Sequence, residues 1–360
     1  MQLPVMPPVA PMLAKLAREV PAGDWRYEPK WDGFRCIAFR DGDEVELGSR
    51  NERPLTRYFP EVVAAVRARL PERCVLDGEI VVAGPAGLDF DALSQRIHPA
   101  ASRVAVLSER TPAAMVAFDL LALDGADLRP APFDERRAAL EELVGTSTAG
   151  VHLTPLTRER RVAADWFTRF EGAGLDGVVA KRPDQSYLED QRVMVKVKHE
   201  RTAEFVVGGF RWYRGEAGGA VGSLMLGLYG TGGELRHVGV IGSFPAADRR
   251  RLVAELAPYR TGGGHPSAGW AELAGDDTPA GRAARTHGGS RWSAGRDLSF
   301  ELLRPELVVE AAYEHMQGER LRHTARFRRW RPDRRPEDCT YEQLDVAVPA
   351  LLEEVFVARG

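Results

Sequence analysis

Lysine is scarce in this 360-residue chain, although basic residues in general are not. Lysine and arginine together number 49, and five of these are lysines: Lys15, Lys30, Lys181, Lys196 and Lys198. Arginine stays protonated at any working pH, whereas a lysine whose pKa is depressed can act as a nucleophile. We therefore regard the few lysines as the first candidates for chemistry.

Cysteine is also rare, and the sequence has no long apolar run. Cys36, Cys74 and Cys339 lack the spacing of metal ligands, and an odd number of cysteines fits a reducing compartment better than a disulfide framework. No run is long enough to span a membrane, and no signal-peptide pattern opens the chain. We therefore expect a cytoplasmic protein with no membrane partner.

The positive charge is unevenly distributed along the chain. The net charge of −3 does not by itself indicate nucleic-acid binding, but residues 320–335 contain eight arginines and one aspartate. A cluster of this density can contact several phosphates. The length of the chain is sufficient for two domains, each with its own core.

Strand and helix patterns alternate over the first 200 residues. Residues 34–50 are expected to form a hairpin, and residues 74–83 a pair of strands around a tight corner at Asp77-Gly78. Residues 113–125 read as a strongly apolar strand. Helical spacing is found at residues 57–70, 90–97, 133–144 and 163–171.

The helix expected at 133–144 would turn a charged side to solvent. That side carries Arg136, Arg137, Glu141 and Glu142. Beyond residue 203, five short strands and one helix, at 248–259, suit a small Greek-key barrel of the oligonucleotide-binding (OB) kind. The glycine-rich stretch 261–295 lacks periodicity and is expected to be a mobile loop.

Lys30 stands in the segment YEPKWDGFR (27–35), immediately before a turn expected at Asp32-Gly33. The ordinary lysine pKa of about 10.4 would have to fall by ~3 units, which requires roughly 4 kcal/mol from the surroundings. Neighbouring cations could supply part of this, and Arg35, Lys196 and Lys198 are candidates. Without the motifs downstream, a surface lysine before a hairpin turn would explain the segment equally well.

Seven segments, in this order, resemble the motifs of ATP-dependent DNA ligases. They are KWDGFR (30–35), GSRN (48–51), LDGEIVV (76–82), AFDLLALDG (117–125), LDGVVAKR (175–182), VKVK (195–198) and RWRPDR (329–334). The resemblance is closest to the short bacterial ligases called ligase C and to the ligase part of ligase D. It extends from about Met12 to Glu342, nearly the whole chain.

The resemblance implies an α+β fold in two domains. The first, 1–200, would be an adenylation (nucleotidyltransferase) domain of antiparallel sheets with flanking helices. An OB-fold domain, 201–345, and a C-terminal tail, 346–360, would follow. The implied activity is the sealing of 3′-hydroxyl/5′-phosphate nicks in duplex DNA, in DNA repair, by a monomeric enzyme that uses ATP with Mg²⁺ or Mn²⁺.

The resemblance also implies a role for each matching residue. Lys30 would attack the α-phosphate of ATP and carry AMP, which then passes to a DNA 5′-phosphate and is displaced by the 3′-hydroxyl. Glu28 would contact the nucleotide, Arg35 its sugar, Phe118 the adenine, and Lys196 and Lys198 the α-phosphate. Glu79 would contact the ribose and the metal, and Asp176 the metal. Arg50 would contact the phosphate at the nick, and Arg331 and Arg334 the pyrophosphate.

Four of these roles have a plainer structural alternative. Arg35 and Arg50 could be ordinary exposed arginines, and Glu79 a solvated turn residue. Phe118 stands in an apolar run, so core packing competes with stacking on adenine. The alternating pattern of VKVK directs Lys196 and Lys198 to one face of a strand.

The sequence departs from the family pattern at two positions. Asp176 stands where glutamate is common, one methylene shorter but still able to bind magnesium through oxygen. Arg334 stands where lysine is usual, and a guanidinium can contact pyrophosphate through two hydrogen bonds.

Three alternative functions stay open at this point. An RNA ligase and an mRNA guanylyltransferase share the lysine motif, although RWRPDR and AFDLLALDG favour a DNA ligase. A non-catalytic nucleic-acid-binding protein built on a barrel would form no covalent adduct with AMP.

Overall fold

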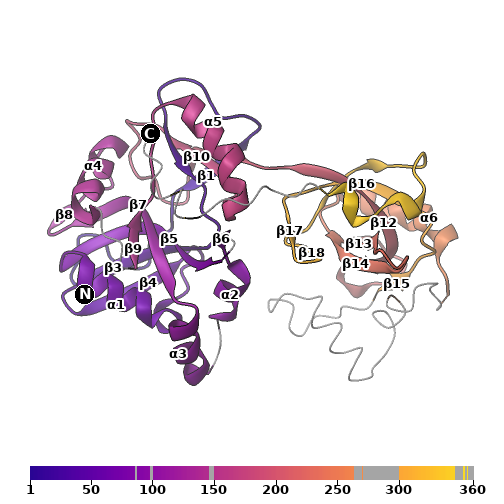
Figure 1. The fold of residues 1–360 in the computed structure, drawn as a ribbon, viewed down its shortest axis with the longest axis horizontal. Coiled ribbons are helices and arrows are strands. Elements are labelled where there is room, and N and C mark those ends of the chain that lie inside the picture. The colour runs from indigo at the N-terminus through magenta and orange to yellow at the C-terminus, as the bar shows by residue number, and fades with distance from the viewer. Residues whose placement is uncertain are drawn as a thin grey trace. The chain divides into compact units, whose positions relative to one another are not determined.

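The computed structural model divides the chain into two compact units (Figure 1). The first is Met1–His199 with Ala347–Gly360, and the second is Glu200–Val346. The residues that the structure describes are 1–85, 87–97, 100–145, 150–262, 270, 300–344, 352 and 355. Within these residues, no helix has both the length and the apolar character that crossing a membrane requires.

The first unit contains a smaller and a larger sheet. The smaller has the order β1-β11-β10-β2, formed by β1 (Leu13–Ala17), β2 (Arg26–Pro29), β10 (Gly177–Lys181) and β11 (Arg192–Lys198). The larger has the order β4-β3-β5-β7-β8, with β6 beside β5 and β9 beside β7. Its strands are β3 (Phe34–Asp41), β4 (Glu44–Ser49), β5 (Arg73–Gly84), β6 (Gly87–Leu88), β7 (Ala113–Leu123), β8 (Ala126–Asp127) and β9 (Val151–Leu153).

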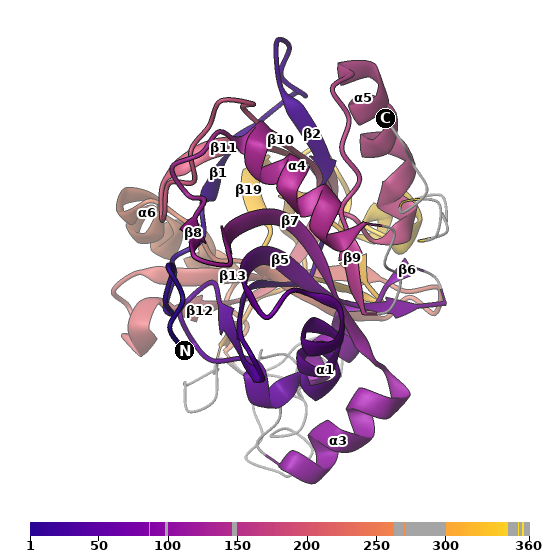
Figure 2. The ribbon, with the colours of Figure 1, turned by 90° about the vertical axis from the view of Figure 1, so that its left-hand side faces the viewer.

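Helices lie around these sheets (Figure 2). Each helix buries some of its apolar residues. Their bounds are α1 (Pro60–Arg69), α2 (Phe90–Gln95), α3 (Ala101–Arg110), α4 (Phe133–Val144) and α5 (Arg160–Arg169). Val62 and Val66 of α1 and Leu140 of α4 join the buried core of the larger sheet. Helix α5 contributes Ala163 to the apolar cluster of the smaller sheet.

The predicted hairpin is confirmed, because β3 and β4 pair in antiparallel register from Cys36–Ser49 to Asp41–Glu44. Gly42 takes the positive φ of 60° that such a two-residue turn requires. The prediction of a corner at Asp77-Gly78 is wrong, since β5 runs through both residues. A Cβ on Gly78 would lie 2.6 Å from the carbonyl oxygen of Val116, so glycine there permits the close approach of β7, at a shift in the pairing register.

The prediction that α4 turns both arginines to solvent is also wrong. Arg136 and Arg137 are buried, with 0% and 5% of their surface exposed, although Glu141 is exposed. Arg136 pairs with the buried Asp119 through two hydrogen bonds of 2.7 and 3.0 Å, which offsets the cost of burying either charge alone. Helix α3 was not predicted from the sequence.

The second unit is built on a five-strand path, β14-β13-β12-β16-β19, with β15 beside β12. Its elements are β12 (Arg201–Trp212), β13 (Val221–Tyr229), β14 (Leu235–Ile241), α6 (Ala246–Leu256), β15 (Glu301–Leu302), β16 (Val308–Tyr313), β17 (Met316–Gln317), β18 (Arg320–Leu321) and β19 (Arg326–Trp330). Ala325 forms a bridge with Ile241, so the chain entering β19 meets β14 at the other end of the path. The loop predicted at 261–295 falls almost entirely outside the described residues.

Candidate active site

A pocket in the first unit brings together seven of the residues singled out from the sequence. They are Glu28, Lys30, Arg35, Arg50, Glu79, Phe118 and Lys196. Lys181 and Arg192 also line this pocket and had been given no role from the sequence. The scarcity of lysine was the signal that could have identified Lys181, whereas Arg192 is one of many arginines.

Lys30 is placed by the backbone of the smaller sheet. It follows β2 directly, and its amide donates to the carbonyl of Gly177 at 2.8 Å, while the amide of Asp176 donates to the carbonyl of Lys30 at 2.9 Å. These two bonds continue the β2–β10 ladder by one residue. They bring the side chain of Lys30 beside that of Asp176.

Asp176 is shared by two lysines. Its Oδ2 accepts from Lys30 Nζ at 2.8 Å and lies 3.0 Å from Lys198 Nζ. Burial alone would raise the pKa of this carboxyl, but the positive charges of Lys30 and Lys198 more than offset burial and hold the pKa well below its usual value. Asp176 therefore orients the Lys30 amine and is a weak acceptor for its proton.

Glu79 lies across the segment that follows Lys30. Its Oε1 accepts from the amide of Gly33 at 3.2 Å. A Cβ on Gly33 would lie 2.2 Å from the carbonyl oxygen of Ile80, so the glycine after Lys30 is required by close packing against β5. Burial raises the pKa of Glu79 to about 7, against the opposing charges of Arg35 and Lys30.

Arg35 is held by a carboxylate behind the pocket wall. Its Nε and one terminal nitrogen donate to the two oxygens of Asp77, both at 2.5 Å, and Asp77 is fully buried. The guanidinium carbon lies 4.4 Å from the centre of the Phe118 ring. Phe118 is 8% exposed, so part of its ring borders the pocket while the rest packs in the wall.

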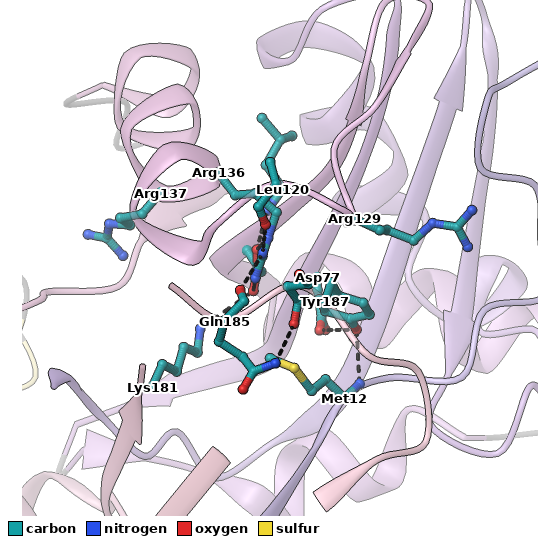
Figure 3. A network of polar contacts seen from close by, with 12 residues as sticks. Met12, Asp77, Leu120, Arg129, Arg136, Arg137, Lys181, Gln185 and Tyr187 are labelled. Carbon is teal, nitrogen blue, oxygen red and sulfur yellow. Dashed lines mark hydrogen bonds and ion pairs between the residues drawn. The ribbon is translucent and has the colours of Figure 1, made fainter. Parts of the chain in front are cut away.

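A buried charge network lies beside Phe118, and Figure 3 shows two of its cations, Lys181 and Arg137. Lys181 Nζ lies 2.9 Å from Glu28 Oε2 and donates to the carbonyl of Phe118 at 2.9 Å. Arg137 approaches the other oxygen of Glu28 at 3.4 Å. Burial raises the pKa of Glu28, and the charges of Lys181 and Arg137 oppose that rise.

Comparison with known proteins bears directly on this pocket. The family model described as "ATP dependent DNA ligase domain" matches residues 10–198, more than half of the chain, and "ATP dependent DNA ligase C terminal region" matches residues 217–334. The chain belongs to the ATP-dependent DNA ligase family. The predicted family and activity are thereby confirmed, and the RNA ligase and guanylyltransferase alternatives are not favoured.

Mycobacterial ligases are similar over nearly the full length. DNA ligase C of Mycobacterium tuberculosis is 57% identical over 360 residues, covering 99% of each chain. DNA ligase C2 of Mycolicibacterium smegmatis is 58% identical over 345 residues, covering 96% of each. A solved Lig E DNA ligase is 16% identical, with a TM-score of 0.55 over 89% of this chain and 99% of that one, which shows a shared fold.

The arginines of the RWRPDR motif belong to the second unit of the ligase. There Arg331 contacts Glu204, lies 3.4 Å from Glu310 and pairs with Asp333 at 2.8 Å. Arg334 lies 4.0 Å from Glu204. Arg331 is thus paired with carboxylates of its own unit, whereas Arg334 is exposed and lies at the outer limit of an ion pair with Glu204.

Glu79 and Asp176 are the candidate metal ligands of the ligase. Among the described residues, no group of three or more His, Cys, Asp or Glu side chains could hold a metal ion. Mg²⁺ is commonly bound by one or two carboxylates together with substrate phosphates. Glu79 lines the pocket, whereas Asp176 is paired with Lys30 and Lys198, so a divalent ion at Asp176 would have to replace those pairings.

Proposed function

We propose that this ligase seals 3′-hydroxyl/5′-phosphate nicks in duplex DNA by way of an AMP covalently attached to Lys30. The observation that carries the proposal is the position of Lys30 Nζ, held 2.8 Å from Asp176 in a pocket lined by cations and by Phe118. Such a pocket suits a nucleotide, because its cations face phosphates and its aromatic ring faces a base.

In the first step the Lys30 amine, once deprotonated, attacks the α-phosphorus of ATP, and the bond to pyrophosphate breaks. Asp176 keeps the amine in place, and Lys196 supplies positive charge on the pocket lining for the α-phosphate. Phe118 would stack on adenine, and Glu28 would contact the nucleotide. Arg35 and Glu79 would bind the ribose.

The later steps transfer AMP to a 5′-phosphate and then release it. Arg50 is exposed and lines the pocket, which suits contact with the phosphate at the nick. Lys198 is proposed to assist at the α-phosphate once its pairing with Asp176 is released. A divalent ion, Mg²⁺ or Mn²⁺, held by Glu79 and Asp176, would neutralise charge on the phosphates.

The second unit is proposed to be an OB-fold barrel within residues 201–345. The bridge between Ile241 and Ala325 supports this, since it joins the two ends of the strand path. We propose that Arg331 and Arg334 leave their carboxylate partners to contact pyrophosphate. We also propose that the ligase acts as a monomer in DNA repair in the cytoplasm; its three free, buried cysteines support the reducing compartment alone.

The test compares nucleotides and substrates. Purified ligase is given labelled ATP or GTP, and then nicked duplex DNA or nicked RNA. The proposal predicts a protein adduct with ATP and sealing of nicked DNA. Adduct formation with GTP and sealing of RNA alone would refute it.

A further inference from the structure

Tyr187 lies behind the pocket, in the segment between β10 and β11, and is 4% exposed. Its hydroxyl donates to Asp77 Oδ2 at 2.6 Å and accepts from the amide of Met12 at 3.1 Å (Figure 3). Both of these partners are buried. Tyr187 itself is not among the residues that line the pocket.

Tyr187 and Arg35 contact the same two residues, Asp77 and Met12, although at Met12 Tyr187 contacts the amide and Arg35 contacts the carbonyl. Arg35 forms a pair of 2.5 Å hydrogen bonds with Asp77, and its terminal nitrogen also donates to the carbonyl of Met12 at 3.4 Å. The Tyr187 hydroxyl therefore contacts both of the residues that hold the Arg35 guanidinium. A carboxylate held from behind in this way has less freedom to rotate with the arginine it binds.

The segment that carries Tyr187 is itself tied down. The amide of Tyr187 donates to the carbonyl of Arg129 at 2.8 Å. Two residues earlier, the carbonyl of Gln185 accepts from Arg136 at 2.8 Å. The ring packs in a cluster with Met12, Ile37 and Met194. Burial, and then the charge of Asp77, raise the pKa of the Tyr187 hydroxyl well above its usual value, so it stays protonated and donates.

We propose that Tyr187 is a positioning residue for the nucleotide sugar: its hydroxyl fixes Asp77 and Met12, and these hold Arg35 in the orientation that binds ribose. The inference rests on the proposed contact between Arg35 and the sugar. It adds a residue from outside the pocket to nucleotide recognition, and it assigns to Tyr187 a function beyond packing.

The test is Tyr187→Phe in the full-length protein, assayed for adduct formation with ATP, 2′-deoxy-ATP and 3′-deoxy-ATP. We expect the Kd for ATP in this single-turnover reaction to rise about tenfold, with the rate constant at saturating ATP changed less than about twofold, since a hydrogen bond to the charged Asp77 is lost. One of the two deoxy analogues should be the one against which wild type discriminates more strongly. We expect the variant and wild type to bind that analogue with the same affinity, because it lacks the hydroxyl that Arg35 is proposed to contact. Discrimination between ATP and that analogue should therefore shrink by the same factor.

Tyr27→Phe is the matched control, because Tyr27 is also fully buried and its hydroxyl donates to a backbone carbonyl, that of Pro21, at 2.6 Å. It should leave the discrimination unchanged. If Tyr187→Phe does not fold, Tyr187→Met, which keeps a long apolar side chain in the cluster with Met12 and Met194 and removes the hydroxyl, tests the same discrimination. Discrimination kept at the wild-type value in the variant that folds would overturn the inference.

The outcome for wild type separates this inference from the proposed function. If wild type forms the adduct but does not discriminate against either deoxy analogue, then Arg35 does not read the sugar and the inference fails, while the covalent chemistry stands. If wild type forms no adduct with ATP, both fail together.

Discussion

Titration of Glu79 should make the stability of the nucleotide-free ligase depend on pH. Burial raises the pKa of Glu79 to about 7, compared with 4.5 for an ordinary glutamate. Because the folded protein binds this proton more tightly than the unfolded chain, the stabilisation is fully present below pH 4.5 and is lost as the pH rises through 7. Between pH 5 and pH 8 the loss amounts to at most about 2.5 kcal/mol, and solvent in the pocket reduces it to about 1–2 kcal/mol.

Glu79→Gln isolates this contribution, since an amide oxygen can still accept from Gly33 but does not ionise in this range. Urea unfolding of both proteins at pH 5, 6, 7 and 8, without nucleotide, gives the difference in free energy of unfolding. We expect the variant to gain about 1–2 kcal/mol relative to wild type from pH 5 to pH 8. Glu142→Gln, on the exposed side of α4, is the control and should show no such gain. A difference for Glu79→Gln that is flat with pH would refute the reasoning.

Three further predictions follow from particular contacts. Asp176→Asn should slow adduct formation by about tenfold or more, because Lys30 loses its charged partner; Asp176→Glu, the residue common in the family, should restore most of the rate, and a fully active Asn variant would contradict the role. Arg334→Ala should slow adduct formation more than the sealing of a nick that already carries AMP, and the reverse result would contradict the pyrophosphate role. Arg136→Ala should cost about 3–5 kcal/mol in unfolding free energy, because it leaves Asp119 without its paired hydrogen bonds, whereas Arg251→Ala, which breaks exposed pairs on α6, should cost less than about 1 kcal/mol.

The sequence predicted the residues that line the pocket better than it predicted the residues behind them that hold these side chains in place. The predicted residues that line the pocket stand in short motifs, several of them within strands such as β5, β7 and β11. Lys196 is one of them, and Lys198, two residues further along β11, pairs with Asp176. The ribose and phosphate contacts were assigned from the resemblance of these motifs to those of ATP-dependent DNA ligases, and their roles stay predictions.

Contacts between distant segments were beyond the sequence. Nothing in the order of residues indicates that Asp176 lies between Lys30 and Lys198, or that Tyr187 reaches Asp77. The sequence analysis expected cations around Lys30. In the structure, the amine of Lys30 contacts the carboxylate of Asp176. Such pairings depend on the register of strands that are far apart in the chain.

Charged residues in α4 were misjudged for a related reason. A helical pattern that combines arginines and glutamates suggests a solvent-exposed side. Arg136 is buried because it pairs with Asp119, a residue of strand β7 that the pattern of the helix does not indicate. Gly78 was read as a turn because glycine after aspartate often marks one. In the structure it is the neighbouring strand, at Val116, that requires the missing side chain.

The most direct test of the account is the mass of the purified protein after incubation with ATP and Mg²⁺, followed by peptide mapping. We predict an increase of one AMP, located on Lys30, that disappears when pyrophosphate is added. An AMP located on any other lysine, or sealing of nicked DNA from ATP by Lys30→Ala, would contradict the central claim.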